Sequence, residues 1–110
     1  MKVAVVLLFV AMAASAATRA EVEHLAIGRD LYRENCSVCH DIDKDKAHSK
    51  KLGPSLNHLF KNEILPLSHG KPGRPYVETR IKFGGSIMPA FQKRLTHDEI
   101  NTLMDYIDSK

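Results

Sequence analysis

The sequence lacks tryptophan, has only two cysteines among its 110 residues, and is 6% aromatic. No segment alternates apolar and polar residues as a half-buried strand does, and no internal repeat or low-complexity linker is present. The remaining patterns have helical spacing, so the sequence predicts an all-α class. Both cysteines lie in one short cluster, so no disulfide within the chain can link segments that are distant in the sequence.

The start of the chain has the layout of a secretory signal. One early cation, Lys2, precedes an apolar or small run over residues 3–14 and then the small residues 14–16. A membrane-spanning helix needs about 20 apolar residues, and this run is shorter. We therefore predict export to the periplasm without stable membrane insertion, with an uncleaved anchor as the alternative. Cleavage is expected after residue 16, 17 or 20, preferably after Ala20, which gives a signal over 1–20 and a single domain over 21–110.

Removal of this signal would leave 14 basic and 13 acidic side chains, so the whole-chain pI of about 9.0 overstates the basic character. No basic stripe interleaved with aromatic residues is present, and nucleic-acid binding is not expected. A domain of about ninety residues buries only a marginal apolar core. Such a domain usually needs a disulfide, a metal or a cofactor to stabilise it.

The apolar pattern predicts a first helix over residues 22–35, whose apolar positions are Val22, Leu25, Ile27, Leu31 and Tyr32. The charged segment 41–51 has no such periodicity and is expected to be a loop. A short helix is expected around Leu56, Leu59 and Phe60, after the break at residues 53–54.

Pro75 is suited to open another helix that runs up to Gly84. Thr96 and Glu99 have the spacing of a capping box before a final helix with an apolar stripe at Ile100, Leu103, Met104 and Ile107. The expected fold therefore has about four to five short helices joined by long loops.

The chemistry concentrates in Cys36-x-x-Cys39-His40, where one helical turn would direct two thiols and an imidazole to one side. A structural zinc site would need a fourth ligand from a distant histidine. A redox-active disulfide between Cys36 and Cys39 is chemically possible, but the βαβ context of thioredoxin-like enzymes is missing and His40 has no role in it. The favoured interpretation is covalent haem, with thioethers from Cys36 and Cys39 and with His40 as the proximal iron ligand.

From about residue 24 to residue 108, the chain resembles the class I c-type cytochromes, small monohaem electron carriers. The matching stretches occur in the family's order: GRDLYRENCSVCH, GPSL at 53–56, IKFGGSIMPAF at 81–91, and a closing helix with LMDYI. The resemblance implies the cytochrome c-like fold, wrapped around one haem c that is attached through Cys36 and Cys39.

The resemblance also implies that Met88 is the sixth iron ligand, opposite His40, and that the carbonyl of Pro54 accepts a hydrogen bond from the His40 ring. The other methionine of residues 21–110, Met104, belongs to the apolar stripe of the last helix, so its expected role is core packing and not iron ligation. The rival sixth ligands are His58, His69 and His97. In this family the face of the first helix that carries Gly28 and Tyr32 crosses the last helix near Leu103, Tyr106 and Ile107. We expect this contact to be part of the hydrophobic core and to take no part in the chemistry of the site.

The expected function is a periplasmic shuttle that carries single electrons between redox donor and acceptor proteins and is not an enzyme. We expect a monomer or a small subunit of a redox complex. Two alternatives are a cytochrome c subunit of a periplasmic dehydrogenase complex and, in a different class, an open-site haem enzyme or gas sensor. Candidate partners of the haem propionates are Arg74, Tyr76 and Arg80. A basic docking rim is less favoured than a solvated surface for Lys44, Lys46, Lys50, Lys51, Lys82, Lys93 and Arg94.

Overall fold

The computed structural model describes residues 2–44, 50–64 and 70–110, with side chains from residue 18 onward. The elements that lie wholly within these ranges are three α-helices and one 3-10 helix, and no described residue is in a strand, which confirms the all-α class. The elements are α1 (Lys2–Asn35), η2 (Leu59–Lys61), α2 (Arg74–Phe83) and α3 (His97–Asp108). The number of α-helices is slightly below the four to five that the sequence predicted, because the stretch around Leu56 forms only the 3-10 turn η2.

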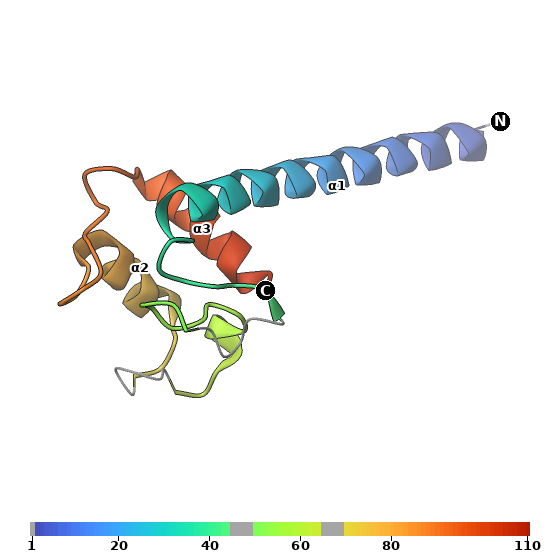
Figure 1. Cartoon of the computed structure of the whole chain (residues 1–110). Coiled ribbons are helices and arrows are strands. Elements are labelled where there is room, and N and C mark those ends of the chain that lie inside the picture. The colour runs from blue at the N-terminus through green and yellow to red at the C-terminus, as the bar shows by residue number, and fades with distance from the viewer. Residues whose placement is uncertain (1, 45–49, 65–69) are drawn as a thin grey trace.

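Helix α1 spans 34 residues, so the predicted start at residue 22 is wrong and the predicted end at residue 35 is correct. The segment before residue 22 contains seven alanines, the residue with the highest helix propensity, and no glycine or proline interrupts it. Figure 1 shows the N-terminal half of α1 extending beyond the other elements. Among the described residues, no helix combines the length and the apolar character that a membrane crossing requires.

The C-terminal half of α1 crosses α3, as expected for this pair of helices (Figure 1). Gly28 allows the close approach: a Cβ at this position would lie 2.6 Å from the backbone oxygen of Thr102 and 2.6 Å from Cβ of Tyr106. One turn later, the rings of Tyr32 and Tyr106 pack with centroids 5.9 Å apart. Val22 and Ile27 were expected on the buried face but are exposed, so the contact face of α1 is narrower than predicted.

Helix α3 is the centre of the fold, since α1, η2 and α2 all pack against it. Its capping box is confirmed: the Glu99 backbone N–H donates to the Thr96 hydroxyl and the Thr96 N–H donates to the Glu99 carboxylate. The predicted apolar stripe is buried, and Tyr106, which was not predicted in it, is buried as well. The buried residues of α3 are Ile100, Leu103, Met104, Tyr106 and Ile107. Met104 is 1% exposed, which assigns this methionine to the core.

Helix α2 begins one residue before the predicted Pro75 and ends at Phe83, with Gly84 as its C-cap. An ion pair attaches its first turn to α3, because Arg74 Nη1 lies 2.8 Å from Asp105 Oδ1. The other carboxylate oxygen of Asp105 lies 2.8 Å from His24 Nε2 of α1. Burial alone would raise the pKa of Asp105, but hydrogen bonds from His24 and Arg74 outweigh it and hold the pKa below its usual value.

Candidate functional site

The two cysteines and the histidine lie on one hydrogen-bonded turn that continues directly from α1. The backbone N–H of Cys36 donates to Tyr32 O, and the N–H of His40 donates to Cys36 O at 2.9 Å. The second bond closes an α-type turn over residues 36–40. The helix α1 itself ends at Asn35, and this hydrogen-bonded turn follows it directly as far as His40. The local geometry of the predicted one-turn arrangement is therefore present.

Both cysteines are free thiols in the structure. Cys36 is buried and belongs to the hydrophobic core, whereas Cys39 is half-buried. Burial, with a smaller contribution from Cys39, raises the pKa of the Cys36 thiol to about 11. The side chain of Cys36 therefore faces the protein interior, where an apolar group attached to it would be sheltered from water.

The ring of His40 is held by a hydrogen bond between Nδ1 and Pro54 O, 2.7 Å long and partly buried. A carbonyl oxygen only accepts hydrogen bonds, so Nδ1 must carry the proton. In this tautomer the other ring nitrogen, Nε2, has a free lone pair, which is the donor atom that a metal ion needs. The hydrogen bond thus fixes both the orientation of the ring and the availability of Nε2.

The loop at Gly53 supports the same ring from behind. A Cβ on Gly53 would lie 2.7 Å from His40 Nδ1 and 2.8 Å from Cys39 O, so only glycine fits between the loop and the turn. Two backbone hydrogen bonds of 2.7 Å hold the loop there, one from Gly53 N to Cys39 O and one from Leu56 N to Asp41 O. For Gly53 itself the sequence had indicated only a chain break, whereas the family resemblance had implied the role of the Pro54 carbonyl.

Tyr32 makes a second contact that the sequence did not predict. Its hydroxyl donates to the backbone oxygen of His40 over 2.7 Å, so this face of α1 does more than pack against α3. Burial, followed by the negative charges of Asp41 and Asp43, raises the pKa of Tyr32 to about 12. The phenol is therefore protonated at any physiological pH and acts as a hydrogen-bond donor.

Two lysines of the less favoured docking rim, Lys51 and Lys82, have acidic partners within the chain. Lys51 Nζ donates to Ser37 O at 2.6 Å and pairs with Asp41 at 3.0 Å, bracketing the turn 36–40. Lys82 pairs with Glu78 at 2.6 Å, and this hydrogen bond holds the pKa of Glu78 below its usual value. Lys46 lies outside the described residues. These pairs agree with the preferred interpretation of a solvated charged surface.

Met88 lies in a loop over residues 84–90 whose two ends are joined. Across its base, Phe91 N donates to Ile81 O at 3.0 Å, and within it Gly85 N donates to Met88 O at 2.9 Å. Gly84 adopts a positive φ of 69°, and a Cβ there would collide with Met88 O. The Met88 side chain is half-buried and packs against the core. Unlike Met104 it is not enclosed by helices, so it remains available as a ligand.

The histidines that rival Met88 as sixth iron ligand, and the candidate partners of the haem propionates, can be located only in part. His97 is exposed and lies 3.3 Å from Glu78, His58 is exposed in a left-handed turn, and His69 lies outside the described residues. Arg74 pairs with Asp105, and Arg80 donates to Gly84 O and to the Tyr76 hydroxyl. The predicted role of these three residues toward propionates stays a prediction.

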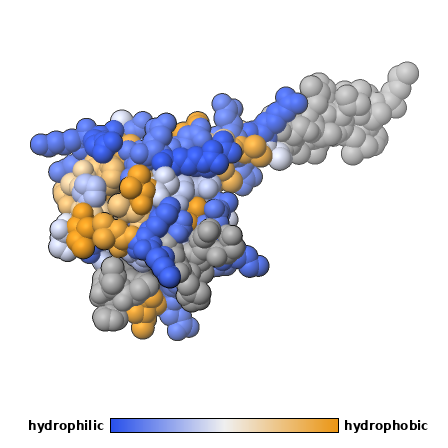
Figure 2. All heavy atoms as spheres, in the orientation of Figure 1, coloured by the Kyte–Doolittle hydropathy of each residue, from blue (hydrophilic) through white to orange (hydrophobic). Residues whose placement is uncertain are grey.

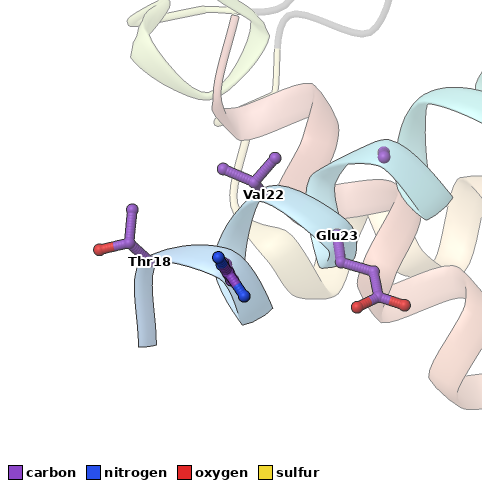
Figure 3. A pocket seen from close by; sticks show the side chains of 5 residues that line it. Thr18, Val22 and Glu23 are labelled. Atoms are coloured by element: carbon purple, nitrogen blue, oxygen red, sulfur yellow. The ribbon is translucent and has the colours of Figure 1, made fainter. Parts of the chain in front are cut away.

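A hollow on the surface of α1 lies away from these residues. Figure 3 shows the side chains that line it, which are Thr18, Arg19, Val22, Glu23 and Ala26. All five come from one helix, and none belongs to the turn 36–40 or to the loops at Gly53 and Met88. Figure 2 shows a different feature, with apolar side chains gathered over α2 and the loop after it.

The residues around His40 fit a covalently attached haem. The donor set consists of two free thiols on one turn, one of them in the core, and an imidazole whose Nε2 lone pair is available. Thioether formation consumes thiols, and haem iron takes a histidine nitrogen as its proximal ligand. In the described part of the chain, no three His, Cys, Asp or Glu side chains gather as a metal-ion cluster.

Comparisons with known proteins agree with this donor set. The family model described as "Cytochrome C oxidase, cbb3-type, subunit III" matches residues 23–107. Cytochrome c6 of Gloeothece citriformis is 30% identical over 83 residues, which cover 76% of this chain and 68% of that protein. For cytochrome c6 of Euglena gracilis the identity is 29%, with 73% and 85% of the two chains covered.

A third relative, cytochrome c6 of Diacronema lutheri, is 28% identical over 86 residues, which cover 78% of this chain and 95% of that protein. No solved structure gives a significant match. The family match extends over the turn with Cys36, Cys39 and His40 and over the loops that carry Pro54 and Met88. The chain therefore belongs to the monohaem c-type cytochromes, whose single haem c it attaches through Cys36 and Cys39.

Proposed function

We propose that this protein is an exported single-electron carrier that shuttles electrons between a donor and an acceptor protein. The observation that carries the proposal is the His40–Pro54 hydrogen bond of 2.7 Å, which leaves Nε2 free beside the two attachment cysteines. The relatives named cytochrome c6 and the family match over residues 23–107 support the same assignment.

When bound, the haem supplies a reversible one-electron couple at its iron. The chain's own residues attach the group, orient it and keep its environment constant. Cys36 and Cys39 fix it to the end of α1, and His40 presents Nε2 from a ring that Pro54 orients. We assign Met88 as the second axial ligand, because its half-buried side chain extends from a loop closed by Phe91 and capped by Gly84.

With His40 and Met88 both holding the iron, no position would be open to substrate, and little would rearrange when an electron arrives. For this reason we propose a carrier that catalyses no bond chemistry. A thioether ligand also favours the reduced state and therefore raises the reduction potential.

We further propose that residues 1–20 direct export to the periplasm and are removed after residue 16, 17 or 20, which leaves the domain 21–110. The partners are redox proteins, and the working form is a monomer or a small subunit of a redox complex. Co-purification from the native periplasm distinguishes a free carrier from a dehydrogenase subunit. Mass measurement of the exported protein identifies the cleavage position.

The central test uses protein matured in a c-type maturation system. Under denaturing conditions its mass should equal the mature chain plus one haem. A spectroscopic redox titration should then fit a single reversible one-electron step. A mass equal to the bare polypeptide would overturn the attachment. A holoprotein that turns over peroxide, or that binds carbon monoxide readily in the reduced state, would instead support the open-site alternative.

A further inference from the structure

We propose that Tyr32 is a positioning residue for His40, acting through the hydrogen bond from its hydroxyl to the His40 backbone oxygen. The proposal rests on the proposed function, in which His40 supplies an axial nitrogen to the haem iron. It assigns a role in ligand geometry to a side chain that the sequence indicated only as a packing residue.

The bond is short and sheltered. The Tyr32 hydroxyl lies 2.7 Å from His40 O, and the Tyr32 side chain is only 7% exposed. The helix α1 ends at Asn35, and the carbonyl groups beyond a helix end lack intrahelical partners. Tyr32, in the last turns of α1, supplies a hydrogen-bond donor for one such carbonyl, that of His40.

The position of the hydroxyl is itself set by α3. The Tyr32 ring packs against the Tyr106 ring at a centroid distance of 5.9 Å and an interplanar angle of 41°. Gly28, one turn earlier, brings α1 within van der Waals range of Tyr106. The helix crossing therefore holds the phenol in place, and the phenol holds the His40 peptide.

His40 is consequently fixed at both ends. Its backbone oxygen accepts from Tyr32, and its ring Nδ1 donates to Pro54 O. A ligand must be held within about 0.5 Å of its working geometry by such supporting contacts. A hydrogen bond from Nδ1 to a carbonyl also makes the imidazole a more basic ligand. Loosening the His40 peptide should weaken that bond and with it the ligand's basicity.

The test compares two variants of the haem-loaded protein, Tyr32→Phe and Tyr106→Phe. Each removes one hydroxyl from the same ring pair and keeps both rings, and Tyr106→Phe leaves the Tyr32–His40 bond in place. The first measurement is hydrogen exchange of the His40 Nδ1–H in the reduced protein by NMR. Loss of a neutral hydrogen bond should speed exchange about fivefold in Tyr32→Phe. Tyr106→Phe should match the wild type.

The second measurement is the reduction potential. A less basic imidazole stabilises the oxidised iron less, so Tyr32→Phe should raise the potential while Tyr106→Phe leaves it unchanged. Equal exchange rates and equal potentials in the two variants would show that Tyr32 only packs, and would overturn the proposal. A wild-type protein without covalent haem would instead refute the proposed function, so the two failures are distinct.

If Tyr32→Phe does not accumulate as holoprotein, 3-fluorotyrosine can replace tyrosine in the Tyr106→Phe background. The ring shape is then nearly unchanged, and the fluorinated phenol is a stronger hydrogen-bond donor. Exchange of the His40 Nδ1–H should slow relative to the unlabelled Tyr106→Phe protein. An unchanged exchange rate would overturn the positioning role.

Discussion

Gly53 lies directly against the imidazole of His40, so that a Cβ at residue 53 would come within 2.7 Å of Nδ1. Gly53→Ala must therefore push the ring or the loop away and strain the His40–Pro54 bond. We expect a loss of about 1–3 kcal/mol in the free energy of unfolding of the holoprotein, measured by guanidinium denaturation.

Gly73→Ala is the matched control, because the nearest atom to a Cβ there is Pro75 Cδ at 3.7 Å and the backbone φ is an ordinary −72°. This variant should lose less than about 1 kcal/mol. Equal losses in the two variants would contradict the close packing of Gly53 against His40.

The helices that position the site were predictable because each carries a local signal. The pair Thr96 and Glu99 marked the start of α3, and the glycine after Phe83 marked the end of α2. Local signals failed at the start of α1, where helix-forming residues continue upstream of the predicted boundary. The predicted boundary at residue 22 rested on the apolar pattern, whereas the helix continues upstream through residues that favour helix on their own.

The contacts that hold His40 depend on segments that are far apart in the sequence. The attachment turn was evident from Cys36, Cys39 and His40, and the resemblance supplied Pro54. Nothing in the sequence showed that the hydroxyl of Tyr32 reaches His40 O or that Gly53 fills the space behind the ring. Both contacts arise from tertiary packing, which periodicity does not encode.

Asp105 should make the stability of the fold depend on pH in the acid range. Its pKa is lowered in the folded state by hydrogen bonds from His24 and Arg74, although burial opposes the shift. A carboxylate with a depressed folded pKa contributes stability above its unfolded pKa of about 3.9, and the contribution is lost as the pH falls through the folded pKa. Asp105→Asn should cost about 1 kcal/mol near neutral pH, since the pairs are about 40% exposed.

Denaturation of the holoprotein across a series of pH values measures this effect. The difference between wild type and Asp105→Asn should disappear at the lowest pH, where Asp105 is protonated. Asp108→Asn is the control, since Asp108 is exposed at the end of the same helix and its removal should change stability little. If the wild type is still more stable than Asp105→Asn at a pH below the pKa of Asp105 in the folded protein, the ion-pair explanation is wrong.

Attachment of the haem should be necessary for the fold. Replacing both Cys36 and Cys39 by Ala removes the thioethers from a domain of about ninety residues with a marginal apolar core. Because the bound group stabilises only the folded state, the double variant should be largely unstructured by far-UV circular dichroism. Val38→Ala is the control within the same turn, since Val38 is 84% exposed and should retain both haem and fold. A cooperative helical melt of the double variant would show that the fold forms before the haem arrives.

Residues 21–110 contain two methionines, Met88 and Met104, and a comparison of their variants tests the assignment of the second axial ligand. Met88 is half-buried in a closed loop, whereas Met104 is 1% exposed in the core. If Met88 ligates the iron, the oxidised protein should show a weak far-red band from sulfur-to-iron charge transfer. Met88→Ala should abolish this band, open the iron to carbon monoxide and lower the reduction potential.

Met104→Ala should keep the band and instead lose about 2–5 kcal/mol of stability, as expected when a buried methionine is truncated. Absorption spectra of the oxidised variants, carbon monoxide titration of the reduced variants and denaturation curves separate these effects. The loop geometry makes the distinction specific: Gly84 and the Ile81–Phe91 hydrogen bond hold the loop independently of the Met88 side chain, so its removal should leave the loop folded. A wild-type protein without the band that binds carbon monoxide readily would exclude Met88 as a ligand and favour the open-site haem protein.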